Sequence, residues 1–112
     1  MVSTAYDEGL ATRIRDLVGG EHGLVEKRMF GGLAMLLDGN MALGVHGESL
    51  IVRAEPDEYE VFLAEPGARP FDITGRPMKG WLFVDPEGCA EDADLRRWVD
   101  RGISYARSLP PK

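Results

Sequence analysis

One arginine and a pair of glycines lie in one short segment that could hold an anion. This segment is Arg28-Met29-Phe30-Gly31-Gly32, where the glycines could let the backbone approach a ligand while Arg28 binds its negative charge. A structural explanation competes, because glycine inside a strand usually marks a β-bulge or a bend. The glycines do not form a dinucleotide-binding fingerprint or a P-loop, since both motifs need further glycines and a following helix. The segment is therefore a candidate binding site or a bend in a strand.

A second candidate site runs from Arg69 to Lys79, the most basic short stretch of an acidic chain. Arg69, Arg76 and Lys79 are accompanied there by a single acidic residue, Asp72. Such a loop could hold an anionic ligand, a nucleic-acid phosphate or an acidic partner surface, and Trp81 could add a stacking contact. It could equally be a solvated turn whose charges offset acidic residues nearby. Any binding surface on this loop is expected to centre on Arg76 and Lys79.

No arrangement of residue types predicts catalysis, a metal site or a cofactor. Nucleophilic catalysis needs a nucleophile beside a base, and none of the serines lies in such a motif. His22 and His46 are far apart in the sequence and lack further ligands at metal-binding spacing, so both are expected at the surface. Cys89 precedes acidic residues, which favours a buried or inert thiol over a nucleophile. We expect no enzyme, no cofactor and no metal.

The composition is that of one acidic globular domain covering residues 1–112. Hydrophobic residues make up 44% of the chain and charged residues 29%, as in ordinary folded proteins. The formal net charge of −6 disfavours nucleic-acid binding, which usually needs a basic surface, although a local basic patch is not excluded. No apolar stretch approaches the ~20 residues that span a bilayer, and the start lacks the apolar segment of a signal peptide. We expect a cytoplasmic protein with no membrane contact.

Hydrophobic periodicity predicts helices near both ends of the chain and a short one between them. The first covers about residues 4–19 and starts at the capping pattern Thr4-Ala5-Tyr6-Asp7. The second begins at Pro56, which suits the first position of a helix, and ends at Pro66-Gly67. The last helix follows the acidic cluster at residues 91–94 and has the clearest apolar face. That face consists of Leu95, Trp98, Val99, Gly102, Ile103 and Ala106.

The segments between these helices predict antiparallel strands. Residues 24–30 alternate with period two, and residues 33–37 are continuously apolar. Tight turns then lead to residues 41–46 and 50–53, and residues 81–84 form a further strand before a type I turn at residues 85–88. Gly31-Gly32 is either a bulge within one long strand or a turn between two short ones. Because these turns are too short for parallel crossovers, we expect an α+β two-layer sandwich with an antiparallel sheet of about five strands.

Several of these segments together resemble the TfoX/Sxy N-terminal domain family. They are spread over nearly the whole chain and occur in one order. The segments are Arg28–Gly32, Asp38–Met41, Leu50–Arg53, Pro66–Pro70, Gly75–Trp81 and Arg107–Pro110. The resemblance implies the element order α-β-β-β-α-β-β-α, which favours one long bent first strand.

The resemblance also implies a functional setting, because the founding members of the family act in transcriptional control of DNA uptake. Those competence regulators continue into a second domain, whereas this sequence ends at Lys112, so we expect a stand-alone copy of the domain. The resulting hypothesis is a non-enzymatic regulatory domain that binds an unidentified protein partner, with a homodimer as one form. It requires an exposed apolar patch.

Two alternative functions stay open. Nucleic-acid binding through residues 69–79 with Arg28 or Arg53 requires these basic side chains to converge on one face. Binding of a small anion requires a concave pocket near Gly31-Gly32.

Overall fold

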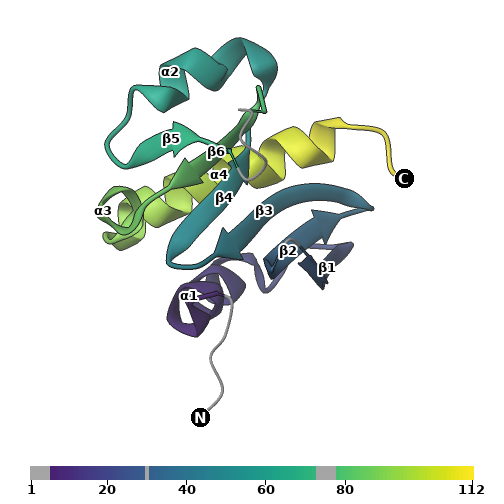
Figure 1. The fold of residues 1–112 in the computed structure, drawn as a ribbon. Coiled ribbons are helices and arrows are strands. Elements are labelled where there is room, and N and C mark those ends of the chain that lie inside the picture. Colours follow the sequence, from purple (N-terminus) through teal and green to yellow (C-terminus); the bar gives the residue numbers. More distant parts are fainter. Residues whose placement is uncertain (1–5, 30, 73–77) are drawn as a thin grey trace.

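The computed structural model describes residues 6–29, 31–72 and 78–112 and confirms an α+β domain with one antiparallel sheet (Figure 1). The sheet has six strands in the spatial order β1-β2-β3-β4-β6-β5, so β1 and β5 are its two edges. The elements are α1 (Glu8–Val18), β1 (Leu24–Met29), β2 (Gly32–Leu37), β3 (Asn40–His46), β4 (Ser49–Arg53), the 3₁₀ turn η1 (Pro56–Glu58), α2 (Tyr59–Leu63), β5 (Ala68–Pro70), β6 (Trp81–Val84), α3 (Pro86–Cys89) and α4 (Asp92–Ser108).

The first helix begins later than its sequence predicts. Asp7 is the N-cap, and its carboxylate accepts hydrogen bonds from the backbone N–H groups of Gly9 (2.8 Å) and Leu10 (3.3 Å). Asp7 was expected inside the first turn of the helix, with Thr4 as the cap, and Thr4 lies outside the described residues. The short acidic side chain therefore supplies the acceptor that the first N–H groups need, and α1 starts at Glu8.

The last helix has the apolar face that the sequence predicts, and every residue of that face is buried. Trp98 is fully buried at its centre. Gly102 lets the helix approach the sheet closely, because a Cβ atom there would lie 2.6 Å from the carbonyl oxygen of Ala42 in β3. Helix α4 therefore packs directly on the middle of the sheet and fixes the main core.

Gly31-Gly32 belongs to a hairpin turn, and the expectation of one long bent first strand is wrong. Strand β1 pairs with β2 from Leu24 opposite Leu37 to Met29 opposite Gly32, which leaves only residues 30 and 31 between them. Gly31 has a φ of 72°, a conformation that glycine adopts at little cost in a tight turn. Four strands therefore precede α2, where the resemblance implied three.

Two further segments differ in detail from the sequence expectations. Residues 68–70 form strand β5, although the sequence suggested a loop there, because they pair with β6 at the edge of the sheet. Residues 85–88 were expected to form a type I turn, but Pro86 instead opens the single helical turn α3.

The sheet carries side chains into two apolar clusters, one on each face. The larger core contains inward side chains of β2, β3, β4 and β6 together with buried residues of α1, α2 and α4. The smaller cluster consists of Ile51, Phe71 and Phe83, with Met41 and Trp81 packed against it. In the part of the chain that the structure describes, no helix is long and apolar enough to cross a membrane.

Candidate interaction edge

Of the basic residues singled out in the sequence, Arg28 lies apart from the others that the structure describes. Arg28 lies on β1 and Arg69 on β5, at opposite edges of the six-stranded sheet. Five strand spacings separate these edges, or roughly 24 Å at about 4.8 Å per spacing. Arg76 lies outside the described residues, and Lys79 is exposed beside β6. Arg28 therefore does not share a surface with the described part of residues 69–79, whereas Arg53 lies opposite Trp81, beside that segment.

Arg69 already has partners within the domain. Its Nε atom donates to Oδ2 of Asp85 over 2.9 Å, and its guanidinium carbon lies 4.4 Å from the ring centroid of Phe83. The hydrogen bond from Arg69 lowers the pKa of Asp85 against the opposing effect of partial burial, and a second hydrogen bond from Ser49 adds to the lowering. Arg69 therefore ties β5 to the end of β6.

Trp81 is also engaged by neighbouring side chains. The guanidinium carbon of Arg53 lies 5.0 Å from the Trp81 ring centroid and 5.5 Å from that of Tyr105. Phe71 contacts Trp81 with the ring centroids 6.0 Å apart. The side chain is half-buried as a result, so its main contacts are structural.

The glycine pair is also explained by backbone geometry. A Cβ atom on Gly32 would overlap the carbonyl oxygen of Val45 on the neighbouring strand β3. Grooves lined by described residues lie between α2 and α4, beside Cys89, and between α1 and α4. These grooves do not include Gly31 or Gly32, and the anion-site hypothesis gains no support from them.

The large apolar side chains that are exposed in the described residues lie on separate elements. They are Val25 on β1 (62% exposed), Val61 on α2 (67%) and Met78 before β6 (45%). Val25 is separated from the other two by the width of the sheet. They do not form the single apolar patch that the protein-binding hypothesis requires, so any protein partner must be bound in another way.

Strand β1 is an open edge, meaning that its outward backbone groups have no hydrogen-bond partner among the described residues. The N–H of Asp38 donates to the carbonyl oxygen of Gly23 over 3.1 Å, which fixes the phase of the β1–β2 ladder. Hydrogen-bonded pairs alternate along an antiparallel ladder, so Val25 and Lys27 direct their backbone groups to β2. The backbone groups of alternate residues point outward, and no bond to them is found in the described residues. These residues are Leu24, Glu26 and Arg28.

Strand β5 is a protected edge, because each of its outward N–H donors is either absent or already hydrogen-bonded within the domain. Gly67 accepts from the N–H of Asp85 over 2.8 Å, and the N–H of Phe71 donates to Trp81, so positions 68 and 70 face outward. The N–H of Ala68 donates instead to the carbonyl oxygen of Glu65 over 3.1 Å. Position 70 is proline, which has no N–H to donate. No free N–H therefore remains at the outward positions of β5.

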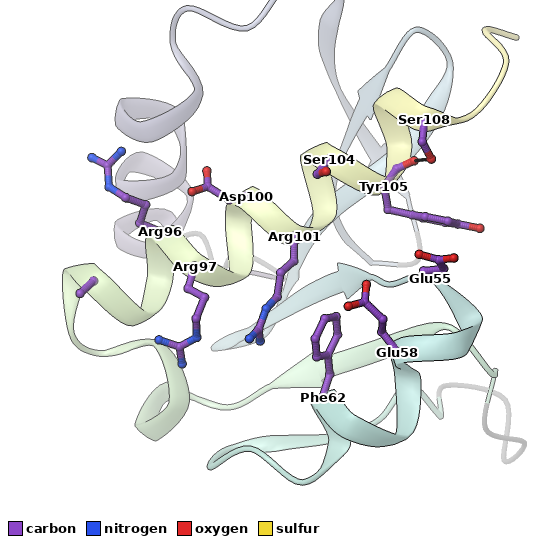
Figure 2. A pocket seen from close by; sticks show the side chains of 11 residues that line it. Glu55, Glu58, Phe62, Arg96, Arg97, Asp100, Arg101, Ser104, Tyr105 and Ser108 are labelled. Carbon is purple, nitrogen blue, oxygen red and sulfur yellow. Dashed lines mark hydrogen bonds between the residues drawn. The ribbon is translucent and has the colours of Figure 1, made fainter.

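Contacts along the α2–α4 groove hold in place the segment that protects β5. It is an open groove of about 660 Å³ between η1–α2 and α4, and Figure 2 shows Arg101 reaching from α4 toward Phe62 of α2. Two arginines of α4 bind Glu65, Arg101 over 2.8 Å and Arg97 over 3.2 Å. The guanidinium carbon of Arg101 also lies 4.1 Å from the Phe62 ring centroid. The groove arginines thus anchor the segment that covers β5.

The ion pairs at Glu65 perturb its ionisation. Burial alone would raise the pKa of the Glu65 carboxyl, but the hydrogen bonds and charges of Arg101 and Arg97 outweigh it and hold the pKa below its ordinary value of 4.5. Glu65 therefore acts twice at this edge, because its side chain binds α4 while its backbone carbonyl accepts the N–H of Ala68.

Comparison with known families identifies the domain. The TfoX N-terminal domain model matches residues 16–106 of this chain. The chain belongs to the TfoX N-terminal domain family. The match includes all six strands of this TfoX N-terminal domain, and therefore both edges described above. No curated protein and no solved structure matches the chain.

The residues that define the two edges of this TfoX N-terminal domain were missed in the sequence, except for Arg28 and Arg69. Pro70 is the one direct signal, because proline within a sheet is confined to edge strands and bulges. The roles of Glu26 and Glu65 depend on contacts between distant segments, such as the 2.7 Å ion pair from Arg15 to Glu26.

The remaining candidates from the sequence lie apart from these edges. Cys89 is buried, and burial raises the pKa of its thiol. His22 is exposed, and His46 is half-buried beside Phe83.

Proposed function

We propose that this chain is a non-enzymatic regulatory domain that binds a protein partner by strand addition at β1. The observation that carries the proposal is the contrast between an open six-residue edge and a protected three-residue edge in the same sheet. The resemblance to competence regulators supports the regulatory setting.

Strand addition fits a surface without a large apolar patch. An added strand gains main-chain hydrogen bonds from the sheet edge, while alternate side-chain positions give specificity. The outward groups of Leu24, Glu26 and Arg28 would supply these bonds. Val25, Glu26, Lys27 and Arg28 are all exposed, and Arg15 of α1 binds the Glu26 carboxylate over 2.7 Å.

The charged side chains of β1 suit a selective edge. Natural sheets use charged residues on edge strands to discourage indiscriminate pairing. Glu26, Lys27 and Arg28 carry both signs, so a partner strand needs complementary charges at defined positions. We therefore expect the bound segment to be extended and to carry charges of both signs.

The proposal is tested with a displayed library of random peptides about eight residues long, a length typical of strands. Peptides selected on the wild-type protein are then measured against Arg28→Pro, which removes an outward N–H, and against Arg28→Gln, which keeps it. We expect Arg28→Pro to weaken binding by about tenfold or more, because a main-chain hydrogen bond is lost and the ring obstructs pairing.

The matched Arg28→Gln variant separates the backbone from the side chain. A peptide that depends on strand addition should still bind Arg28→Gln within a few-fold of the wild type. If the selected peptides bind Arg28→Pro as tightly as the wild type, strand addition at β1 is not the binding mode and the proposal is wrong.

A further inference from the structure

The charged side chains of β1 are self-complementary, because an antiparallel pair of β1 strands can place opposite charges facing each other. Glu26 lies opposite Met35 and Arg28 opposite Leu33, and both partners belong to the helix-covered core. Glu26 and Arg28 therefore share the helix side of the sheet, where Arg15 of α1 donates to Glu26 over 2.7 Å. Lys27 lies on the other side, since successive residues of a strand alternate.

A two-fold axis limits how two copies of β1 can pair. In an antiparallel pair related by an axis perpendicular to the sheet, residues that lie opposite each other point to the same face. Residues of the outward set, which includes Glu26 and Arg28, must then face the same set of the second copy. The possible registers therefore differ by steps of two residues.

The charges on Glu26 and Arg28 make these registers differ in stability. Glu26 opposite Glu26, or Arg28 opposite Arg28, places like charges together, which is destabilising. Glu26 opposite Arg28 of the second copy gives two opposite-charge pairs by symmetry, and Arg15 extends each pair into a row of three charges. Lys27 then lies directly opposite Lys27 on the other side of the sheet. This one like-charge pair opposes the two favourable pairs, although the long exposed side chains can diverge into water.

Resting on the proposed function, we infer that the partner at the β1 edge is a second copy of this chain, paired antiparallel with Glu26 opposite Arg28. The two sheets then form one continuous sheet of twelve strands, twice the six of one chain. Its only remaining edges are the two copies of β5, which are protected by Pro70 and by the bond from Ala68 to Glu65. Self-association through edges therefore stops at two copies.

Sedimentation equilibrium of the full chain over a wide concentration range measures this association. We expect the mass to rise from 12.3 kDa to twice that value with increasing concentration. Glu26→Arg and Arg28→Glu each place like charges opposite each other in this register. Each variant alone should dimerise at least about tenfold more weakly than the wild type, because two cross-strand pairs change sign.

Mixing the two charge variants provides the decisive control. A Glu26→Arg chain opposite an Arg28→Glu chain restores both opposite-charge pairs, so a heterodimer should form, and native mass spectrometry can distinguish it from either homodimer. A structural defect in one variant, such as the loss of the Arg15–Glu26 pair, would not be rescued by mixing. Urea unfolding of each variant verifies that it is folded.

Three outcomes overturn the inference: a monomer at every concentration, a dimer indifferent to both charge variants, or variants that fail to form a heterodimer when mixed. The proposed function fails separately. If the chain stays monomeric while selected peptides bind in an Arg28→Pro-sensitive manner, strand addition stands and the second copy is excluded as partner. If the chain stays monomeric and the peptides bind Arg28→Pro as tightly as the wild type, both the strand-addition proposal and the dimer inference are wrong.

Discussion

The two edge strands of the sheet present the same kind of backbone groups, but these groups are protected at β5 and open at β1. At β5 the strand is three residues long, Pro70 removes one outward N–H, and the carbonyl of Glu65 accepts the other. At β1 the strand is six residues long, and its outward groups have no partner in the described residues. Helix α2 lies beside β5 in Figure 1, whereas none of the described helices lies alongside the outer side of β1.

This difference shows that protection of an edge is built from specific contacts. An unprotected strand can template pairing with another chain, and natural sheets usually prevent this. The domain has the means to protect an edge, since it does so at β5 through proline, a short strand and the anchored α2 segment. An edge left open beside a protected one is therefore a candidate for binding.

The largest expected effect comes from a proline at a β1 position whose N–H is directed to β2. Lys27 directs its N–H to β2, so Lys27→Pro should lower the free energy of unfolding by about 3 kcal/mol or more. Arg28→Pro, one residue further, should cost less than about 1 kcal/mol because its N–H points outward. Urea titrations of both variants measure this. Equal losses would show that the phase of the ladder is wrong.

Gly32 offers the next test, because it positions the hairpin that presents β1. Gly32→Ala should lower the free energy of unfolding by about 1–3 kcal/mol, since the added Cβ forces β2 away from Val45. Gly20→Ala is the control, because a Cβ at Gly20 has no atom within 4 Å. Similar values for the two variants would contradict the close approach at Gly32.

The anchor of the β5 edge should depend on pH. The folded pKa of Glu65 lies below its ordinary value of 4.5, so its contribution is present above that pH and is lost as the pH falls through the folded pKa. Glu65→Gln should therefore lower the free energy of unfolding by about 1.5 kcal/mol at neutral pH. The difference from wild type should shrink toward zero as the pH falls through the folded pKa of Glu65.

Glu60→Gln on the same helix is the control for Glu65→Gln. Glu60 is exposed and makes no ion pair within the described residues, so its change should stay within about 0.5 kcal/mol at either pH. A Glu65→Gln difference that persists unchanged in acid would mean that the ion pairs with Arg97 and Arg101 are not its source.

The smallest expected effect is that of Pro70→Thr. Restoring an N–H at an outward position should change the free energy of unfolding by less than about 1 kcal/mol. Amide hydrogen exchange in this variant should then be fast at position 70 and slow at Phe71, whose N–H donates to Trp81. Slow exchange at both positions would show that the outer side of β5 is already paired.

The sequence predicts much of this fold because its strongest signals are local. The apolar face of α4 repeats at helical spacing, and all six of its residues are buried as expected. The sequence does not decide the conformation at Gly31, because two adjacent glycines fit a bulge and a hairpin equally well. Only the pairing of Met29 with Gly32, which depends on the next strand, decides between them.

The candidate site could be predicted only in part, because strand order is a non-local property. Arg28 and Arg69 were both singled out from the sequence, yet nothing in it places them at opposite edges. Glu65 was missed because its partners, Arg97 and Arg101, lie about thirty residues away on another helix, as the separation of 32 for Arg97 illustrates.

The most direct test of the open edge is amide hydrogen exchange in β1, measured residue by residue at a concentration where the chain is monomeric. In the free protein, the amides of Val25 and Lys27 should exchange slowly, and those of Leu24, Glu26 and Arg28 should exchange fast. Saturation with a selected peptide should slow the three outward amides while leaving the β5 edge unchanged. Slow outward amides in the free monomer, or protection that appears only in the α2–α4 groove, would contradict the account.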